Sequence, residues 1–460
     1  MSVLSKLIYK DRKFYRNVTG IALPIALQGL ITTGVNMMDT VMVGAVGETE
    51  LSAVSLANSF INVFQILCMG IGMGASVLVT RYYGMGEQTS MRKAIGIMLR
   101  LCGGIAALFS LAMLFFPEQI MRIYTGDEAI IGQGVLYLRW SVATCFLLGL
   151  SVTCAVILRC VEQVKIPLYA SIFAFFLNVG ANYVFIFGHF GMPRMGVAGA
   201  ALGTLIARIL ETGIICAFLF RKEKQIGFRL RHLFMPVGDL WREYLRICIP
   251  VLISDGIYAL GNNSVAMVIG RLGESFVAAN AVTSVTQQLS SVMIQGFAQA
   301  AAIVTGRTLG EGDRKKAQDQ GYALLGLGFA FGILAAVIIM IISEPMIRAY
   351  GVSPQTAEIA RALMRAISMV VVFQCTNSVM TKGTLRGGGD TKVLMVADNI
   401  FLWLFSIPLG ALAGLVWHWP AFWIYTLLKV DQILKCIWCV WRLHSGKWIK
   451  KIATAGEKVA

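Results

Sequence analysis

The stretch Gly44-Ala45-Val46-Gly47-Glu48 returns as Gly270-Arg271-Leu272-Gly273-Glu274, at an offset of 226 residues. The same offset relates matching residues on both sides of this stretch: Pro24 and Pro250, Asn36 and Asn262, Gly70 and Gly296, Arg81 and Arg307, Gly86 and Gly312, Glu118 and Glu344, Arg139 and Arg365. Leu158-Arg159 then returns one residue late, as Leu385-Arg386. Chance matches would not keep one register for so long, so the chain consists of two copies of one unit.

The composition of this unit is that of a membrane protein. Of 460 residues, 57% are hydrophobic and 14% are charged, whereas about 25% are charged in soluble domains. The apolar residues form runs of roughly 20 or more, which is the length that a helix needs to cross a bilayer. Twelve spans are predicted, six in each half: 17–46, 51–82, 93–116, 131–157, 166–188, 196–220, 245–270, 277–308, 318–343, 355–381, 393–416 and 419–441.

An even number of spans in each copy predicts two parallel six-helix repeats, because both copies enter the membrane from the same side. We therefore expect an all-α integral membrane fold in which an N-lobe and a C-lobe enclose a central cleft. The expected organisation is a cytoplasmic N-terminus (1–16), the N-lobe (17–220), a basic cytoplasmic linker (221–244), the C-lobe (245–441) and a cytoplasmic tail (442–460). Apolar positions in the linker suit a segment that lies on the inner membrane surface.

The distribution of Lys and Arg predicts the orientation in the membrane. Basic residues concentrate on one side, as in the linker, whereas Glu48, Glu118 and Glu274 fall in the opposite connections. Both termini are therefore expected in the cytoplasm. The net charge of +16 indicates contact with the bilayer surface and not with nucleic acid, because the basic residues lie at helix ends and form no continuous stripe. No cleavable signal peptide is evident.

Polar residues inside the predicted spans mark a candidate ion site in the N-lobe. Asp39 lies within the first span, where an acid is costly unless it faces a wet cavity or a partner. Asn178 and Asn182 are four residues apart in the fifth span and therefore share a helix face, and Thr204 adds a hydroxyl in the sixth. Oxygen ligands around one carboxylate suit Na⁺, or could tune a protonatable aspartate. The alternative is a buried acid that is hydrogen-bonded to a neighbouring helix.

Three motifs together give a specific resemblance. Pro24 followed by Asp39-Thr-Val-Met-Val-Gly44 resembles the first helix of the multidrug and toxic compound extrusion (MATE) family. Gly196-Val-Ala-Gly-Ala-Ala-Leu-Gly-Thr204 resembles the start of its sixth helix, and Leu385-Arg-Gly-Gly-Gly-Asp-Thr-Lys392 resembles the loop after its tenth. The resemblance covers nearly the whole chain.

The resemblance implies an exporter of organic cations or amphipathic drugs in the plasma membrane of a bacterial cell, driven by inward flow of H⁺ or Na⁺ and without a cofactor. No metal site is expected, because the cysteines are scattered and the histidines form no cluster. The resemblance also implies that Asp39, Asn178 and Thr204 belong to the ion site. In the prokaryotic branch of the family whose ion site lies in the N-lobe, the resemblance implies a second acid at the position where this chain has Asn182. A site with one carboxylate is easier to reconcile with a proton than with Na⁺, so H⁺ is the favoured coupling ion. We expect a monomer.

The C-lobe offers a rival site. Asp255, Tyr258 and Asn262 lie in the seventh span and Asp398 lies in the eleventh. The resemblance implies a glutamate where Tyr258 stands, so the acid has moved or the site has changed. The structural alternatives are that Asp255 meets headgroup water near the inner end of its span and that Asp398 caps a helix or pairs with a lysine such as Lys429.

Other charged residues within the spans fit structural pairs. Arg208 with Glu211, and Asp431 with Lys435, have spacings that allow pairing on one helix face. Pro24 is a candidate hinge, because proline frees a backbone carbonyl. A catalytic constellation is not evident, so an enzyme is not expected, and neither is the loop signature of a major-facilitator transporter. A flippase for lipid-linked precursors would need a cleft dominated by cations, whereas the sequence indicates acids and amides.

Overall fold

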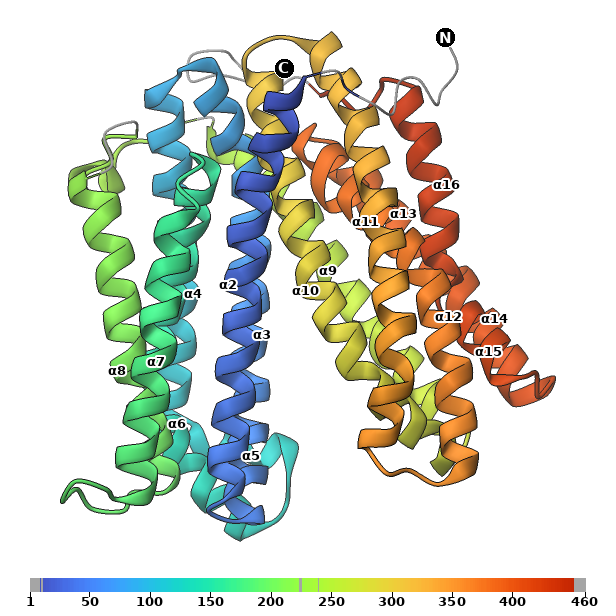
Figure 1. Ribbon diagram of the computed structural model, residues 1–460. Helices are drawn as coiled ribbons and strands as arrows, with labels where there is room; N and C mark the ends of the chain where they lie inside the picture. The colour runs from blue at the N-terminus through green and yellow to red at the C-terminus, as the bar shows by residue number, and fades with distance from the viewer. Residues whose placement is uncertain (1–8, 10, 223–225, 239, 451–460) are drawn as a thin grey trace. The chain divides into compact units, whose positions relative to one another are not determined.

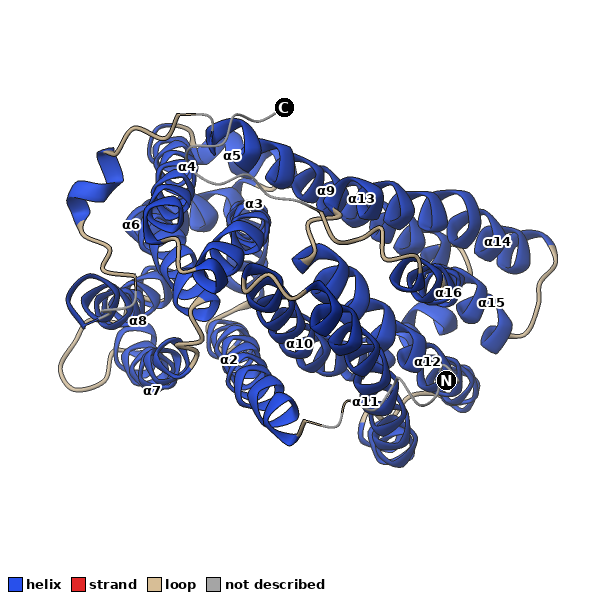
Figure 2. Cartoon of the chain, turned by 90° about the horizontal axis from the view of Figure 1, so that it is seen from above, coloured by secondary structure: helices blue, strands red, loops and turns tan. Residues whose placement is uncertain are grey.

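The computed structural model describes residues 9, 11–222, 226–238 and 240–450. Within these ranges the chain is helical and contains no strand, as Figure 2 shows from above. Eleven of the described helices are long and apolar enough to cross a membrane. The predicted all-α membrane fold is confirmed.

The first copy of the repeat forms long helices joined by short turns. Their bounds are α2 Arg12–Gly44, α3 Glu48–Met85, α4 Gln88–Phe115, α5 Pro117–Tyr124, α6 Glu128–Cys160, α7 Lys165–Phe187 and α8 Val197–Ala217, which continues as the π-helical turn η1 Phe218–Lys222. The short 3₁₀ helix η2, Leu230–Phe234, lies in the predicted linker.

The second copy repeats this order but is more irregular towards its end. Its helices are α9 Leu240–Gly270, α10 Glu274–Gly310, α11 Arg314–Ala349, α12 Pro354–Ser378, α13 Thr391–Ile400, α14 Ile407–Ala411, α15 Ala421–Leu428 and α16 Val430–His444. Three π-helical segments interrupt them: η3 Val379–Leu385, η4 Phe401–Ser406 and η5 Leu412–Val416. The predicted twelfth span is therefore two helices, α15 and α16, which meet at Lys429.

Repeated glycines have a structural reason. Gly86 and Gly312 lie in the turns that follow the second helix of their copies, with φ of +73° and +86°. L-amino acids with a side chain rarely adopt this left-handed region, whereas glycine does so at little cost. Asp127 and Asp313 then cap later helices by accepting hydrogen bonds from the backbone N–H groups of Ala129 and Lys316, both at 2.9 Å. Gly86 and Gly312 thus keep the offset because they share this turn conformation, whereas Asp127 and Asp313 are not related by it.

The helices form two compact units. The N-terminal unit comprises Leu27–Cys248, and the C-terminal unit comprises the described chain from Ile249 together with the start of α2 through Ala26. Within the N-terminal unit α7 runs beside α8, and within the C-terminal unit α11 runs beside α12 (Figure 1). The unit boundary falls inside α2 and α9, within two residues of Pro24 and Pro250 respectively.

Small residues allow the first helices to pack closely. In the C-terminal unit a Cβ at Gly296 of α10 would lie 2.7 Å from the Cβ of Ala26 and 3.0 Å from the carbonyl oxygen of Ala22, both in α2. In the N-terminal unit a Cβ at Gly74 of α3 would lie 2.9 Å from the Cα of Cys248 in α9. Ala22 and Cys248 are themselves related by the 226-residue offset, so each unit contains the start of the other copy's first helix.

Large apolar side chains face outward along many helices. Phe176 is 69% exposed, Ile341 69% and Leu404 66%. A soluble protein would not leave so many such residues in water, whereas lipid tails solvate them without cost.

Candidate functional site

In the N-terminal unit, the structure brings the four predicted site residues together. Nδ2 of Asn182 in α7 donates a hydrogen bond to Oδ1 of Asp39 in α2 at 2.5 Å. The same amide nitrogen lies 3.3 Å from Oδ1 of Asn178, whose own Nδ2 donates to Oγ1 of Thr204 in α8 at 3.4 Å. Asp39 is half-buried and both asparagines are fully buried. One carboxylate therefore ends a chain of amide and hydroxyl groups contributed by three helices.

Close packing of α7 against α8 positions this chain. A Cβ at Gly199 would lie 2.5 Å from the carbonyl oxygen of Phe185, and one at Gly203 would collide with Oδ1 of Asn182. Glycines four residues apart let two helix backbones approach in a membrane. Gly199 and Gly203 have no side chains at this contact, so α8 lies close enough to α7 for Thr204 to reach the asparagines.

One acceptor in this cluster is left without a partner. Oδ1 of Asn182 is buried and receives no hydrogen bond from any described residue. An unsatisfied buried amide oxygen is costly, and the carboxylate of Asp39 lies beside the same amide. The position therefore suits a proton-bearing group or a bound cation.

Sequence reasoning missed a second polar chain in the same unit. Ser171 Oγ donates to Oε1 of Glu211 at 2.8 Å and accepts from Nε2 of Gln28 at 3.0 Å. Oε1 of Gln28 accepts from the guanidinium of Arg159 at 2.6 Å. The predicted pair of Arg208 with Glu211 is present, with Nη1 and Oε2 at 2.5 Å. Glu211 thus has partners on both oxygens.

A small cavity of about 30 Å³ joins the two chains, since Asn178 and Thr204 line it together with Ser171, Arg208 and Glu211. Gln28 and Ser171 carried no sequence signal of their own, because isolated polar residues in a span are common at helix contacts. Spacing identified the Arg208–Glu211 pair but could not show that it borders the Asn178–Thr204 chain.

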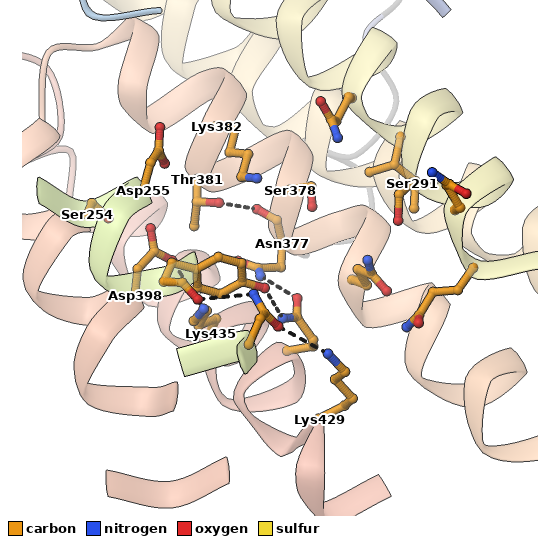
Figure 3. A pocket seen from close by; sticks show the side chains of 18 of the residues that line it. Ser254, Asp255, Ser291, Asn377, Ser378, Thr381, Lys382, Asp398, Lys429 and Lys435 are labelled. Carbon is orange, nitrogen blue, oxygen red and sulfur yellow. Dashed lines mark hydrogen bonds and ion pairs between the residues drawn. The ribbon is translucent and has the colours of Figure 1, made fainter. Parts of the chain in front are cut away.

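The C-terminal unit contains a larger polar pocket of about 370 Å³ (Figure 3). All four C-lobe candidates line it: Asp255, Tyr258, Asn262 and Asp398. Serine, glutamine and lysine side chains supply most of the remaining wall: Ser254, Ser284, Gln287, Gln288, Ser291, Ile294, Gln295, Gln374, Asn377, Ser378, Thr381, Lys382, Lys429, Gln432 and Lys435. Only one of these residues, Ile294, is aliphatic, so the wall of the pocket is polar.

Asp398 pairs with a lysine, as one of the alternatives expected, but the lysine is not Lys429. Asp398 instead pairs with Lys435, at 3.4 Å between Oδ1 and Nζ. The helix is interrupted at Lys429, where α15 ends and α16 begins. Nζ of Lys429 then donates to Oδ1 of Asn262 at 3.4 Å. A continuous helix was assumed for the twelfth span, and the interruption changes which lysine faces α13.

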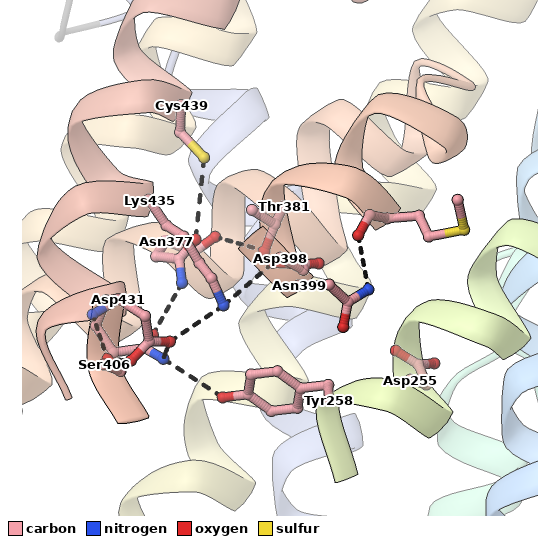
Figure 4. A network of polar contacts seen from close by, with 12 residues as sticks. Asp255, Tyr258, Asn377, Thr381, Asp398, Asn399, Ser406, Asp431, Lys435 and Cys439 are labelled. Atoms are coloured by element: carbon pink, nitrogen blue, oxygen red, sulfur yellow. Dashed lines mark hydrogen bonds and ion pairs between the residues drawn. The ribbon is translucent and has the colours of Figure 1, made fainter. Parts of the chain in front are cut away.

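Lys435 is the centre of the polar network in Figure 4. Its Nζ lies 3.1 Å from Oδ2 of Asp431, which confirms the pair predicted from their spacing. The same ammonium group lies 4.7 Å from the ring centroid of Tyr258, a distance at which the ring attracts a cation. Gln432 donates to Asp431 at 2.7 Å and contacts the Tyr258 hydroxyl at 3.4 Å. Tyr258 therefore joins the network through its ring and its hydroxyl.

Asp255 does not rely on headgroup water for a partner. Its Oδ1 lies 3.5 Å from the guanidinium of Arg386, and its side chain is 32% exposed. Arg386 is the counterpart of Arg159 in the first copy, which binds Gln28. The two copies thus use the same arginine position to bind the middle of their first helix.

The expected predominance of acids and amides holds in the C-terminal pocket, where two aspartates and seven amide side chains outnumber three lysines. Lys382 was not expected among these lining residues. Sequence reasoning placed Lys382 in a connection at the membrane surface, because the tenth span was expected to end at residue 381. In the structure that helix continues as η3 through Leu385, and Lys382 lines the pocket.

Comparison with known proteins decides the family. The family model described as MatE matches residues 24–184 and 250–412, which is more than half of the chain. This chain belongs to the MatE family. The two matched segments begin at Pro24 and Pro250, in agreement with the internal repeat.

Relatives of this MatE protein extend over nearly its whole length. The probable multidrug resistance protein NorM of Thermotoga maritima is 25% identical, over 95% of this chain and 94% of the relative. The multidrug resistance protein PmpM of Pseudomonas aeruginosa is 26% identical, over 86% and 83% respectively. A crystal structure of MATE in the straight conformation superposes with a TM-score of 0.83 at 20% identity, over 97% of this chain and 99% of that one. The MatE protein described here is a bacterial multi-pass membrane transporter.

Proposed function

We propose that this protein is a secondary active exporter of cationic or amphipathic organic compounds, coupled to inward flow of protons by alternating access. Its relatives are named as multidrug resistance proteins. The observation that carries the proposal is the contact of Asp39 with Asn182, because an acid within a span is a functional residue by default. We further propose the lobe boundaries 17–220 and 245–441, cytoplasmic termini and a monomeric state.

The proposed cycle depends on Asp39 changing its charge. In the outward-open state Asp39 takes a proton, which removes its attraction for a cationic substrate. The hydrogen bond from Asn182 favours the ionised carboxylate, so protonation weakens a contact between α2 and α7. Because the proton binds the two states with different affinity, it shifts the equilibrium between them.

The choice of H⁺ over Na⁺ rests on the ligands that Asp39 has. Hard cations prefer several oxygen ligands around them. Near Asp39 only the unpartnered Oδ1 of Asn182 is a free acceptor among the groups that contact it. One carboxylate with one free amide oxygen is a small set for Na⁺, whereas a proton needs a single acceptor.

The test is efflux of a fluorescent organic cation from proteoliposomes under separately imposed H⁺ and Na⁺ gradients. We expect export with a proton gradient, and loss of that export in Asp39→Asn. Asp127→Asn is the matched control, because asparagine caps a helix as well as aspartate does. Full proton-driven export by Asp39→Asn would refute the role of Asp39 and move coupling to Asp255 or Asp398.

A second candidate function is a flippase for lipid-linked precursors. The lysine content of the C-terminal pocket is the observation that favours it, because a diphosphate requires cations. Translocation of a fluorescent lipid-linked diphosphate, without export of the organic cation, would support this function over the first.

A further inference from the structure

The pocket of the C-terminal unit holds more positive than negative charge. Lys382, Lys429 and Lys435 line it, against Asp255 and Asp398. Each aspartate already has a cationic partner, since Asp255 lies 3.5 Å from Arg386 and Asp398 lies 3.4 Å from Lys435. The anions of this pocket are therefore neutralised by groups that belong to the fold.

Two of the three lysines have no such partner. Among the described residues neither Lys382 nor Lys429 makes an ion pair. Lys429 donates to the amide oxygen of Asn262 at 3.4 Å, and Nζ of Lys382 lies 5.8 Å from the ring centroid of Tyr258. Both lysines are only partly exposed. An ammonium group away from water is unfavourable unless an anion or several acceptors compensate it. A bound anion would therefore stabilise these two lysines.

The position of Lys382 is a local departure from the repeat. Arg139 and Arg365 keep the 226-residue offset, whereas Leu158 returns one residue late as Leu385. The extra residue of the second copy falls in the stretch that contains η3, Val379–Leu385. The first copy continues there as the α-helix α6. An inserted residue is commonly accommodated as a π-helical turn, and such turns are frequent at functional sites.

The shared fold does not require a lysine at this place. The counterparts of Lys382 under the two offsets are Val156 and Ala155, both buried and apolar. Gly383, beside Lys382, packs against α10, since a Cβ there would lie 2.9 Å from the carbonyl oxygen of Ala298. The π-helical turn and this contact together turn Lys382 towards the pocket, as Figure 3 shows.

We propose that Lys382 and Lys429 form a binding site for the carboxylate of a small organic anion or zwitterion. The proposal deepens the proposed export function by adding a substrate class to the cations. Arg386 pairs with Asp255, and Lys435 lies between Asp398 and Asp431. The pocket together with these partners therefore carries one excess positive charge, which suits a single carboxylate better than a diphosphate. The volume of about 370 Å³ accommodates a drug-sized molecule, and the glutamines of the wall supply neutral donors and acceptors for the rest of it.

The test uses two fluorescent probes that differ only in charge, dansylglycine and dansylglycinamide. Both are titrated into the purified full-length protein without any gradient. We expect the wild type to bind dansylglycine at least about tenfold more tightly than the amide. Lys382→Met with Lys429→Met should abolish this preference, so that dansylglycine binds no more tightly than the amide. The exposed Lys392→Met is the matched control and should behave as wild type.

Two results would overturn the proposal. One is equal binding of the two probes by the wild type, which needs no variant and is therefore independent of folding. The other is a preference for dansylglycine that survives in the double lysine variant. Proton-driven export of the organic cation is measured without either dansyl probe, so failure of the proposed export function and failure of this site are distinguished.

Discussion

Asn182 is the residue on which the N-terminal cluster depends, because its one amide group contacts both Asp39 and Asn178. Its nitrogen is used twice and its oxygen has no partner. An amide at this position thus holds Asp39 with a donor and keeps a free acceptor beside it. The type of side chain at residue 182 should therefore decide which ion the cluster accepts.

We predict that Asn182→Asp makes the export of organic cations dependent on Na⁺. Two carboxylates in contact repel each other, and a cation between them relieves the repulsion. The measurement is efflux under an imposed Na⁺ gradient at constant pH, where the wild type should show little activity. Asn182→Ala serves as control, because it removes the donor without adding charge. If both variants respond to Na⁺ equally, the second acid is not what selects the ion.

Glu211 is a buried acid that pairs with Arg208 and accepts a hydrogen bond from Ser171. It also lines the small cavity beside Asn178 and Thr204. Glu211→Gln should lower the free energy of unfolding by about 1.5–3 kcal/mol, the usual contribution of a hydrogen bond to a charged group, because Arg208 loses its charged partner. The measurement is thermal unfolding in detergent. The double variant Arg208→Met with Glu211→Met should be less destabilised than Glu211→Gln alone, since no unpaired charge remains. Glu118→Gln, in an exposed pair with Arg122, should change little.

Between helices, the contact of α7 with α8 determines the geometry of the N-terminal cluster. We predict that Gly203→Ala impairs coupled export, because the new methyl group would displace the side chain of Asn182 from Asp39. Gly213→Ala lies in the same helix and meets no atom within 4 Å, so it is the matched control. It should be neutral or slightly stabilising, as alanine favours helix over glycine. Equal export by both variants would show that the Asn182 contact can relax without loss.

Pro24 lies inside α2 close to the point where the helix passes from one compact unit to the other. Pro24→Ala restores a backbone donor and should stiffen the helix. We expect slower turnover with unchanged affinity for the organic cation. Initial rates over a range of substrate concentrations separate the two quantities. Unchanged turnover would argue against a hinge at this position.

Across the whole molecule, the features that could be predicted from the sequence are those visible as apolar runs or as an internal repeat. The spans and the two copies follow from hydropathy and offset, whereas the grouping of Asp39 with the asparagines was what the resemblance to the MATE family implied. The interruption at Lys429 was not predictable, because α15 and α16 read as one apolar run. The same holds for Lys382, since hydropathy ends the tenth span before it, whereas a π-helical turn extends that helix.

The exchange of helix starts between the units has a consequence for synthesis in the cell. The N-terminal unit includes Leu240–Cys248, which belongs to the second copy, and the C-terminal unit includes the start of α2. A ribosome therefore cannot release a finished N-terminal unit until it has translated the beginning of the second copy. The two halves, split within the basic linker and co-expressed, should assemble as complementary fragments, whereas either half alone should be degraded as an incomplete bundle.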